Sequence, residues 1–514
     1  MRKDIKTYIA IVAVIIANVA CTNLDEELFS VVSQENFGKT PEQMDALIAP
    51  AYSSMCEYVD GYYWYDMCSA DDFIIPSRGY DWNHGGAFRH IHEHQFTALE
   101  ADSYYNFWRF SAVTNINKVL AMVESPDVEI ADRDRVVAEL RGLRAWWYFF
   151  MLDRIGNVPI VTKFDDTLPS NKDVTRKDVY DFVVGELEDV VEDLNEEVSS
   201  ATYAKFTKWA GYTLLAKLYL NAGVYTGTGE PDLENALRCC EQVITRGGYI
   251  LEPNNNDNFL VHNEDSRENI LVVPYDYEHF KCYFIPYQMS WHYNHEKTFD
   301  VNFDGGMWNG PCFTPSFMKS YDPDDKRLSW FLYGQQYDKS GNKLKDRKGN
   351  LLDITFDIKD YSNANECEGA RIYKWEVEKG SYNHLNNDFA IFRYVDVLLM
   401  KAECLLRGGD EPGARAIVNQ CRARNFVNYD DTKKIKILTL DELLAERGRE
   451  LVCEGWRRND LIRFGKFTTP FDFKTTNDNA DNHTLLYPIA QSVIDKNPGI
   501  VQNPGYTGAS AETE

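Results

Sequence analysis

The amino-acid sequence predicts a mostly α-helical protein that also has an irregular, loop-rich lobe with short β-strands. Two observations predict this fold class. Apolar residues recur with a period of about 3.6 residues over many segments, as they do in amphipathic helices. Residues 250–389 instead carry clusters of Asn, Asp, Gly and aromatic residues with little helical period. With 514 residues, the chain is long enough for roughly two or three average domains or for one large helical solenoid.

The expected helices follow from this period in chain order. They cover residues 41–58, 103–123, 132–153, 174–196, 207–224, 232–246, 391–407, 411–424 and 440–465. In the pair formed by 208–225 and 230–249, the small residues Ala216 and Ala236 lie where two helices must approach closely. This is typical of a tetratricopeptide hairpin, which buries its apolar face by stacking on its neighbours, although an ordinary helical hairpin explains this pair equally well. Within the lobe, residues 343–358 predict a β-hairpin around a Lys-Gly-Asn turn.

The first residues indicate export and lipid attachment. MRKDIK is a basic start, TYIAIVAVIIANVA is an uncharged run, and Ala20 is a small residue before Cys21. Residues 1–20 therefore read as a secretory signal peptide, because the apolar run is too short to span a bilayer. Cys21 is the expected lipidated first residue of a bacterial lipoprotein; the alternative is cleavage elsewhere. Residues 507–514 are expected to form a disordered tail.

Charge and motifs exclude several function classes. The net charge of −26 and the absence of a basic stripe argue against a nucleic-acid partner. The chain has no G-x-S-x-G, H-E-x-x-H or phosphate-binding loop, so we expect no cofactor and no catalytic residues. A glycosidase would need two carboxyl groups about 5–5.5 Å or about 6.5–9.5 Å apart, whereas the adjacent Asp71 and Asp72 would diverge in a strand.

Several long blocks resemble one family. They are CTNLDEELFS after Ala20, LRGLRAWWYFFMLDRIGNVPIV (140–161), AKLYLNAGVYTG (216–227), FRYVDVLLMKAECLL (392–406), ERGRELVCEGWRRNDLIRFGKF (446–467) and YPIAQSVIDKNPGIVQNPGY (487–506). From Cys21 to Tyr506, the chain resembles the SusD/RagB family of surface nutrient-binding lipoproteins. The resemblance implies about four tetratricopeptide-like hairpins with the lobe packed on them. It divides the chain into an N-terminal region (21–250) and a C-terminal region (251–506), the latter comprising the lobe (251–389), helices (390–467) and a closing coil (468–506).

The resemblance also implies a function. Family members are held on the outer face of the outer membrane by a lipid anchor, and they cap a SusC-like TonB-dependent transporter to capture oligosaccharides or peptides. We therefore expect a non-enzymatic glycan-binding protein. The alternatives are a peptide or glycopeptide binder of the same architecture and a zinc-dependent hydrolase.

Charged residues in the C-terminal blocks have a structural interpretation. Glu446, Arg447, Arg449 and Glu450 predict a salt-bridged helix surface rather than an acid-base site. Asp396 and Glu403 are expected to form ion pairs between helices, with Arg449 or Arg457 as partners.

The first candidate binding segment is SADDFIIPSRGYDWNHGGAFRHIHEHQF (69–96). It resembles the family stretch that contains part of the ligand site in glycan-binding members, which carries over to Arg78, Asp81, Trp82 and Asn83. An indole can stack on the apolar face of a sugar ring, while a guanidinium and an amide bond its hydroxyl groups. Trp82 is the strongest candidate, and its alternative is a partly buried loop tryptophan.

The second candidate segment is SWHYNHEKTFDVNFDGGMWNGPCFTPSF (290–317). Trp291, Tyr293 and Trp308 lie here among Gly and Asn residues that predict loops, and loops carry binding residues more readily than packed helices do. Its block MWNGPCFTPSFMKSYD resembles a family loop that can border the ligand site. We expect these rings to be further stacking platforms, with core packing as the alternative.

Three histidines raise the question of a metal. In an extended segment, alternate side chains share a face, so His90, His92 and His94 would align like zinc ligands, with Glu93 as a base. We expect no metal here. The histidines are instead interpreted as polar support for the segment that holds Arg78, Trp82 and Asn83.

Overall fold

The computed structural model describes residues 40–59, 63–276 and 284–506. The predicted signal peptide (1–20), the lipid anchor Cys21 and the predicted tail (507–514) lie outside these residues. The described helices before the lobe are α2 (Pro41–Tyr52), α3 (Met55–Glu57), α4 (Tyr63–Cys68), α5 (Ala87–His92), α6 (Ala98–Ser103), α7 (Phe110–Val123), α8 (Arg133–Arg154), α9 (Arg176–Val190), α10 (Lys208–Leu220), α11 (Ala222–Thr226) and α12 (Leu233–Arg246). After them come α13 (Pro286–Ser290), α14 (Pro315–Lys319), α15 (Tyr394–Arg407), α16 (Glu411–Ala423), α17 (Leu440–Glu450), α18 (Arg457–Arg463) and α19 (Gln491–Lys496).

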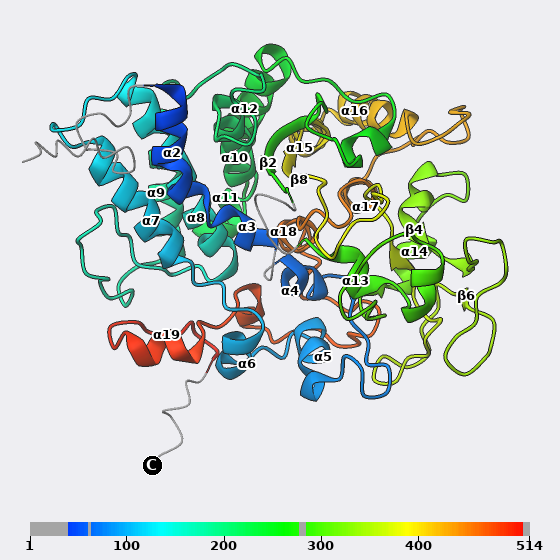
Figure 1. Cartoon of the computed structure of the whole chain (residues 1–514). Coiled ribbons are helices and arrows are strands. Elements are labelled where there is room, and N and C mark those ends of the chain that lie inside the picture. Colours follow the sequence, from blue (N-terminus) through cyan, green and yellow to red (C-terminus); the bar gives the residue numbers. More distant parts are fainter. Residues whose placement is uncertain (1–39, 60–62, 277–283, 507–514) are drawn as a thin grey trace, which may run out of the picture.

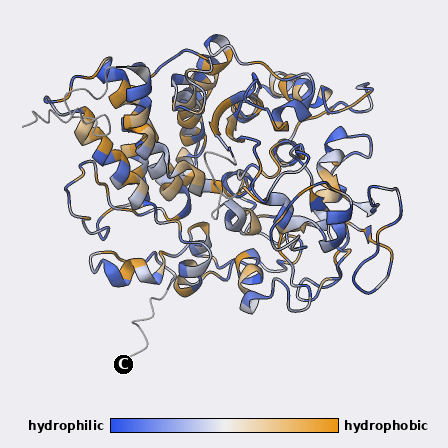
Figure 2. Ribbon diagram, viewed as in Figure 1, coloured by the Kyte–Doolittle hydropathy of each residue, from blue (hydrophilic) through white to orange (hydrophobic). Residues whose placement is uncertain are grey.

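The long helices form a continuous row. Helix α7 packs on α8, α8 packs on α9, α10 packs on α12, and α15 packs on both α12 and α16. Figure 1 shows the row running from α7 on the left, through α10 and α12, to α16 on the upper right. Figure 2 shows hydrophobic and hydrophilic patches on the same helices, as expected for elements that bury one face. The predicted class, mostly α with tetratricopeptide-like hairpins, is confirmed.

Capping side chains explain where many of these helices begin. A side-chain oxygen directly before the helix accepts a hydrogen bond from a backbone N–H of the first turn, which satisfies a donor that has no partner within the helix. The residues that do so are Thr40, Thr97, Thr175, Thr207, Asp232, Asp410 and Thr439.

Several expected helices differ from the structure. Those predicted over 41–58 and 207–224 are each split in two, as α2 with α3 and as α10 with α11. The one predicted over 440–465 is two helices, because Cys453 and Gly455 adopt positive φ angles of 62° and 78°. A Cβ at Gly455 would lie 2.8 Å from the Tyr58 hydroxyl, so the chain approaches the core too closely there for a larger residue. The helix predicted over 391–407 begins at Tyr394, because residues 389–393 form a strand. The helix predicted over 103–123 begins at Phe110.

Short antiparallel strand pairs organise the lobe. Strand β2 (Asn269–Val273) pairs with β8 (Phe389–Arg393), and β1 (Phe73–Ile74) pairs with β3 (Cys312–Phe313). The other two pairs are β4 (Phe331–Leu332) with β7 (Arg371–Ile372), and β5 (Gly334–Gln335) with β6 (Asp353–Ile354). The hairpin predicted within 343–358 is present, since Lys345 bridges Leu351 across its turn. The β1–β3 pair joins the two candidate binding segments.

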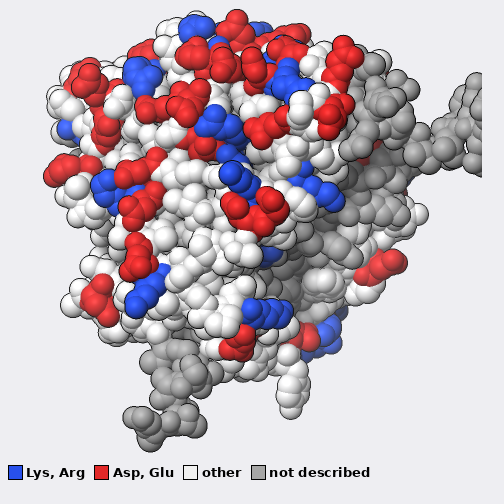
Figure 3. All heavy atoms as spheres, turned by 90° about the vertical axis from the view of Figure 1, so that its left-hand side faces the viewer, with Lys and Arg blue, Asp and Glu red and all other residues white. Residues whose placement is uncertain are grey.

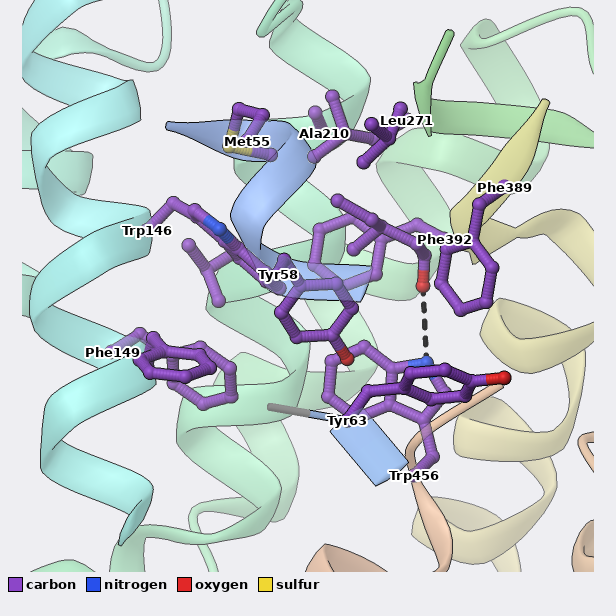
Figure 4. Close-up of a cluster of buried hydrophobic side chains, with 14 of the residues drawn as sticks. Met55, Tyr58, Tyr63, Trp146, Phe149, Ala210, Leu271, Phe389, Phe392 and Trp456 are labelled. Carbon is purple, nitrogen blue, oxygen red and sulfur yellow. Dashed lines mark hydrogen bonds between the residues drawn. The ribbon is translucent and has the colours of Figure 1, made fainter. Parts of the chain in front are cut away.

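A large aromatic core connects the row with the C-terminal helices. Figure 4 shows Trp146 and Phe149 of α8 facing Tyr58, Phe392 and Trp456, with the Trp456 indole N–H bonded to a backbone carbonyl. That acceptor is the Ile391 oxygen in β8, at 3.0 Å. Residues 146, 392 and 456 therefore fix α8, β8 and the α17–α18 connection to one another.

The charged face predicted for α17 is buried rather than exposed to solvent. Glu446, Arg447, Arg449 and Glu450 have at most 5% exposed surface. Burial opposes the charge on Glu446, yet the neighbouring arginines, Arg327 foremost, lower the pKa of its carboxyl group to about 2. The expectation of an ion-paired rather than catalytic face agrees with these contacts, but its placement on the surface was wrong, because the lobe covers this face.

The ion pairs predicted for Asp396 and Glu403 form with other partners. Asp396 pairs with Lys217 at 2.6 Å and with Arg447 at 2.9 Å. Glu403 pairs with Arg463 at 2.9 Å and with Arg407 at 2.9 Å. Arg447 and Arg463 lie on the helix faces that contact α15. The expected partners lie on other faces, where Arg449 pairs with Glu446 and Arg457 pairs with Asp71.

The outer surface of the row is mixed in charge. Figure 3, which views the left-hand side of Figure 1, shows Lys and Arg interspersed with Asp and Glu, with acidic residues gathered along its upper part. Among the described residues, none of the helices combines the length and the apolar character that crossing a membrane requires.

Candidate functional site

The two candidate segments meet at one end of the lobe. Pairing of β1 with β3 brings the loop after residue 77 against the loop before residue 312. A short turn follows, in which Arg78 and Asp81 bridge each other through their backbones and Gly79 has a φ of 70°. Trp82 itself has a φ of 61°, so its backbone is strained into the left-handed region in order to direct the indole toward residues 308–310.

Arg78 lies beneath the surface of these loops, where it contacts their backbone and does not face solvent. It is 4% exposed, and its guanidinium donates to the backbone oxygens of Asn309 at 2.7 Å and Glu368 at 2.8 Å. Arg371 lies beside it and donates to the Asn309 side-chain oxygen at 2.7 Å. Burial lowers the pKa of Arg371 to about 9, and the charge of Arg78 contributes. The sequence-based interpretation of Arg78 as a ligand contact is therefore corrected, because protein carbonyls occupy its donors.

Trp82 and Trp308 form the exposed aromatic part of the site. The Trp82 indole N–H donates to the Trp308 backbone oxygen at 2.7 Å, and the two ring centroids are 6.2 Å apart with an angle of 50°. Trp308 is 37% exposed, while Trp82 is half-buried against Phe88. The close approach depends on Gly310, where a Cβ would lie 2.1 Å from the Trp82 ring.

Tyr293 and Asp81 form the adjoining polar edge. The Tyr293 hydroxyl donates to the Asp81 carboxylate at 2.5 Å, and burial together with this bond raises the pKa of Tyr293 to about 12. Arg347 lies over the Tyr293 ring at 3.9 Å and pairs with Asp81 at 3.2 Å and Glu366 at 2.7 Å. We call Trp82, Trp308, Tyr293, Asp81 and Arg347 the Trp82–Trp308 surface.

Trp291 does not belong to this surface. It has no exposed area, its ring stacks on Tyr287 at 4.4 Å and on Phe299 at 4.0 Å, and its indole N–H donates to the Ile372 oxygen. The expectation of a third stacking platform is wrong here, because Trp291 anchors α13 to β7 within the core.

Asn83 opens onto a small pocket beside Trp82. Asn83 is exposed, and the pocket has a volume of about 210 Å³. Its wall also includes Arg89 of α5 and Ser362. Sequence reasoning missed both Arg89 and Arg347. Arg347 could have been found from its place in the turn of the predicted hairpin. Arg89 could have been found from its place three residues after the Gly85-Gly86 pair, which follows Asn83 and His84.

The three histidines are separated by the fold. Residues 87–92 form helix α5 rather than an extended segment, so the expectation that His90, His92 and His94 share one face is wrong. His90 pairs with Glu100 at 2.6 Å, and His94 pairs with Asp478 at 2.7 Å. His92 is buried between the Cys68 and Asp472 carbonyls, and burial lowers its pKa to about 4.

The described part of the chain contains no group of three or more His, Cys, Asp or Glu side chains that could hold a metal ion. The adjacent carboxyl groups also separate. Asp71 pairs with Arg457 at 2.6 Å, while Asp72 is 1% exposed and has its pKa raised to about 7 by burial and by the charge of Asp71. Neither lines the pocket next to Trp82.

Fold and site together define a tetratricopeptide-like helical scaffold that presents a shallow aromatic surface on a loop-rich lobe. A model described as the SusD family matches residues 280–506, and one described as starch-binding associating with outer membrane matches residues 33–220. The chain belongs to the SusD family.

Relatives in that family span most of the chain. The chain is similar to the starch-binding protein SusD of Bacteroides thetaiotaomicron, with 27% identity over 425 residues that cover 73% of this chain and 74% of that protein. It is also similar to a SusD-like protein of Bacteroides ovatus, with 26% identity over 454 residues that cover 84% of this chain and 77% of the relative.

Solved structures share the fold. A laminarin-binding SusD-like protein superposes with a TM-score of 0.71 at 20% identity and covers 91% of this chain and 100% of its own. Surface glycan-binding protein A from Bacteroides thetaiotaomicron, in complex with laminarihexaose, superposes with a TM-score of 0.67 at 20% identity and covers 90% of this chain and 99% of its own.

Proposed function

We propose that the protein is a non-enzymatic, cell-surface lipoprotein that binds oligosaccharides on the Trp82–Trp308 surface and delivers them to a SusC-like TonB-dependent transporter. One observation carries the proposal. Two tryptophans from segments far apart in sequence are held together at the surface by a hydrogen bond from an indole to a backbone oxygen. Rigid rings of this kind bind the apolar faces of sugar rings and lose little side-chain entropy in doing so.

The polar groups around the rings supply the hydrogen bonds that a sugar needs. Asn83 is exposed beside Trp82, and Asp81 and Arg347 form a charged edge next to Tyr293. Such a combination of an apolar face with a few placed polar groups is typical of carbohydrate recognition. Two of the similar proteins are named for binding starch and laminarin, which supports a glycan as the ligand class.

Affinity electrophoresis tests glycan binding directly. The purified protein is run through gels that each contain one soluble polysaccharide, and a retained case is quantified by calorimetry. Trp82→Ala and Trp308→Ala should each weaken binding roughly thirtyfold, because removing a central aromatic anchor costs about 2 kcal/mol. Phe164→Ala is the matched control, since Phe164 is 45% exposed and packs near Lys118 of α7.

Two results would contradict the proposed function. Retention by none of the polysaccharides, combined with capture of peptides identified by mass spectrometry, would favour a peptide or glycopeptide ligand. Natively purified protein that contains stoichiometric zinc, when the His92→Ala variant contains none, would instead favour a zinc-dependent hydrolase that uses residues 90–94.

Membrane attachment and transport need separate tests. Changing Cys21 to serine should release the protein from the outer-membrane fraction, because acyl chains each contribute about 0.8 kcal/mol per buried methylene to anchoring. Affinity purification of the lipidated protein from solubilised outer membranes should recover a β-barrel transporter. Recovery of the protein alone, at expression levels where it is abundant, would count against the partnership.

A further inference from the structure

We propose that Arg89 binds an anionic group of the ligand, a carboxylate or a sulfate, so that the glycan held on Trp82 is an acidic oligosaccharide. This inference rests on the proposed function and assigns the class of sugar. It starts from the pocket of about 210 Å³ beside Trp82, which both residues line.

The position of the Arg89 guanidinium places it at the wall of this pocket. Its Nη1 donates to Ser362 Oγ at 3.4 Å, and its Nη2 lies 3.7 Å from where a Cβ at Gly86 would stand. The side chain thus reaches from α5 toward Ser362, and Trp82 and Asn83 line the same pocket. A bound sugar that stacks on Trp82 would meet this guanidinium.

Arg89 has no carboxylate partner within the described residues. The side chain is exposed, and its single hydrogen bond there is to a hydroxyl group. Glu93 lies one helical turn away but accepts from Gln95 at 3.0 Å instead. A guanidinium has several N–H donors in a planar fork that matches carboxylate and sulfate oxygens. Most donors of Arg89 therefore remain for a ligand.

The other charges of the neighbourhood are compensated internally. Arg347, the second arginine at the surface, pairs with both Asp81 and Glu366. Arg89 is the one charged residue among those that line the pocket. A larger cavity of about 550 Å³ offers the opposite environment, since its lining has one lysine, Lys379, against four acidic residues, Glu264, Asp276, Glu378 and Asp388. In a chain with a net charge of −26, an anionic ligand finds a favourable place at Arg89 and an unfavourable one in that cavity.

The test compares acidic polysaccharides with chemically matched neutral forms. Gels contain polygalacturonate, alginate or chondroitin sulfate, each beside its carboxyl-reduced or desulfated counterpart. The acidic form should be retained more strongly, and the carboxyl-reduced and desulfated arms separate a carboxylate from a sulfate as the group that is bound. Added NaCl should reduce the difference, because screening weakens a partly exposed ion pair.

Variants identify Arg89 as the origin of the preference. Arg89→Gln should lower affinity for the acidic form about tenfold to a hundredfold, the range expected for a hydrogen bond to a charged group, and should leave the neutral form unchanged. Arg89→Lys should lose less, because the charge remains. Arg238→Gln is the charge-matched control on α12, where Arg238 is half exposed and contacts Asn235.

Several outcomes would overturn the inference, and they differ from failure of the proposed function. Equal retention of acidic and neutral forms, or an Arg89→Gln variant that behaves like Arg238→Gln, would remove the role of Arg89. If only neutral polysaccharides are retained and Trp82→Ala abolishes retention, glycan binding stands while the acidic ligand does not. If peptides with a free C-terminal carboxylate bind through Arg89 and no polysaccharide does, both proposals fail.

Discussion

Replacing Gly310 with alanine would test whether the position of the Trp82 indole controls ligand binding. The added Cβ would lie 2.1 Å from Cε2 and 2.6 Å from Nε1 of Trp82, whereas ordinary contacts begin at 3.4 Å. The indole must therefore move by about 1.3 Å, the difference between 3.4 and 2.1 Å. That movement breaks the hydrogen bond from Trp82 to the Trp308 oxygen.

The expected magnitudes follow from this displacement. Overpacking costs about 1–3 kcal/mol, and the lost hydrogen bond adds about 1 kcal/mol to the loss of folding free energy. A displaced central aromatic should cost about 2 kcal/mol of binding, or roughly a thirtyfold weaker association constant. Calorimetry with the polysaccharide that retains the unmodified protein measures binding, and urea unfolding measures stability.

Gly185→Ala in α9 is the matched control for Gly310→Ala. Nothing lies within 4 Å of a Cβ at Gly185, so this variant should bind normally and unfold at the same or slightly higher urea concentration. Undiminished binding by Gly310→Ala would refute the reasoning, because it would show that ligand affinity does not depend on where the Trp82 ring lies.

Three further predictions concern stability. Trp291→Ala should lower the free energy of unfolding, measured in urea, by about 3–5 kcal/mol because the Trp291 ring is buried. Trp308→Ala should lower it by less than about 1 kcal/mol because Trp308 is 37% exposed. Equal losses in the two variants would contradict the placement of the two rings. Asp396→Asn should cost about 3–5 kcal/mol, since it leaves a buried lysine and a buried arginine short of a counter-charge, and Asp189→Asn on the surface should cost almost nothing. Burial lowers the pKa of His92 from 6.5 to about 4. Between these pH values the unfolded chain binds a proton at His92 and the folded chain does not. The free energy of unfolding should therefore fall by roughly 3 kcal/mol as the pH drops from 6.5 to 4. His92→Gln should shrink the difference in unfolding free energy between pH 7 and pH 4.5, and an unchanged difference would show that His92 is not buried and neutral.

Periodicity predicted the helical row well because each long helix buries one face along its whole length. It failed where the backbone departs from regular structure for reasons of close packing. The break at Gly455 follows from the approach of Tyr58, a residue almost four hundred positions earlier, and local sequence carries no sign of it. Residues 389–392 are apolar and would suit a helix or a strand equally, and the pairing of residues 389–393 with β2 decides that they form a strand.

For the candidate site, the sequence indicates which aromatic and polar residues lie in its loops but not which of them face solvent. Trp291 and Trp308 lie in the same aromatic, glycine-rich stretch, and the sequence offers no means to separate them. The structure separates them because Trp291 is enclosed by Tyr287 and Phe299, while Trp308 lies on the loop that contacts Trp82. The donors of the Arg78 guanidinium suggest a ligand contact, yet the buried loops need those donors for their own carbonyl oxygens.

That use of buried arginines explains how a stable scaffold can carry an adaptable surface. Arg78 and Arg371 hold the loops of the site mainly through backbone oxygens, which are present whatever side chains the loops carry. Exposed residues such as Trp308 and Arg89 contribute little to this support, so they can change without loss of the fold. A TM-score of 0.71 at 20% identity to a laminarin-binding protein fits this division. In the proposed function, a few exposed side chains set the ligand class, and Arg89 is the one whose charge we propose to separate acidic from neutral glycans.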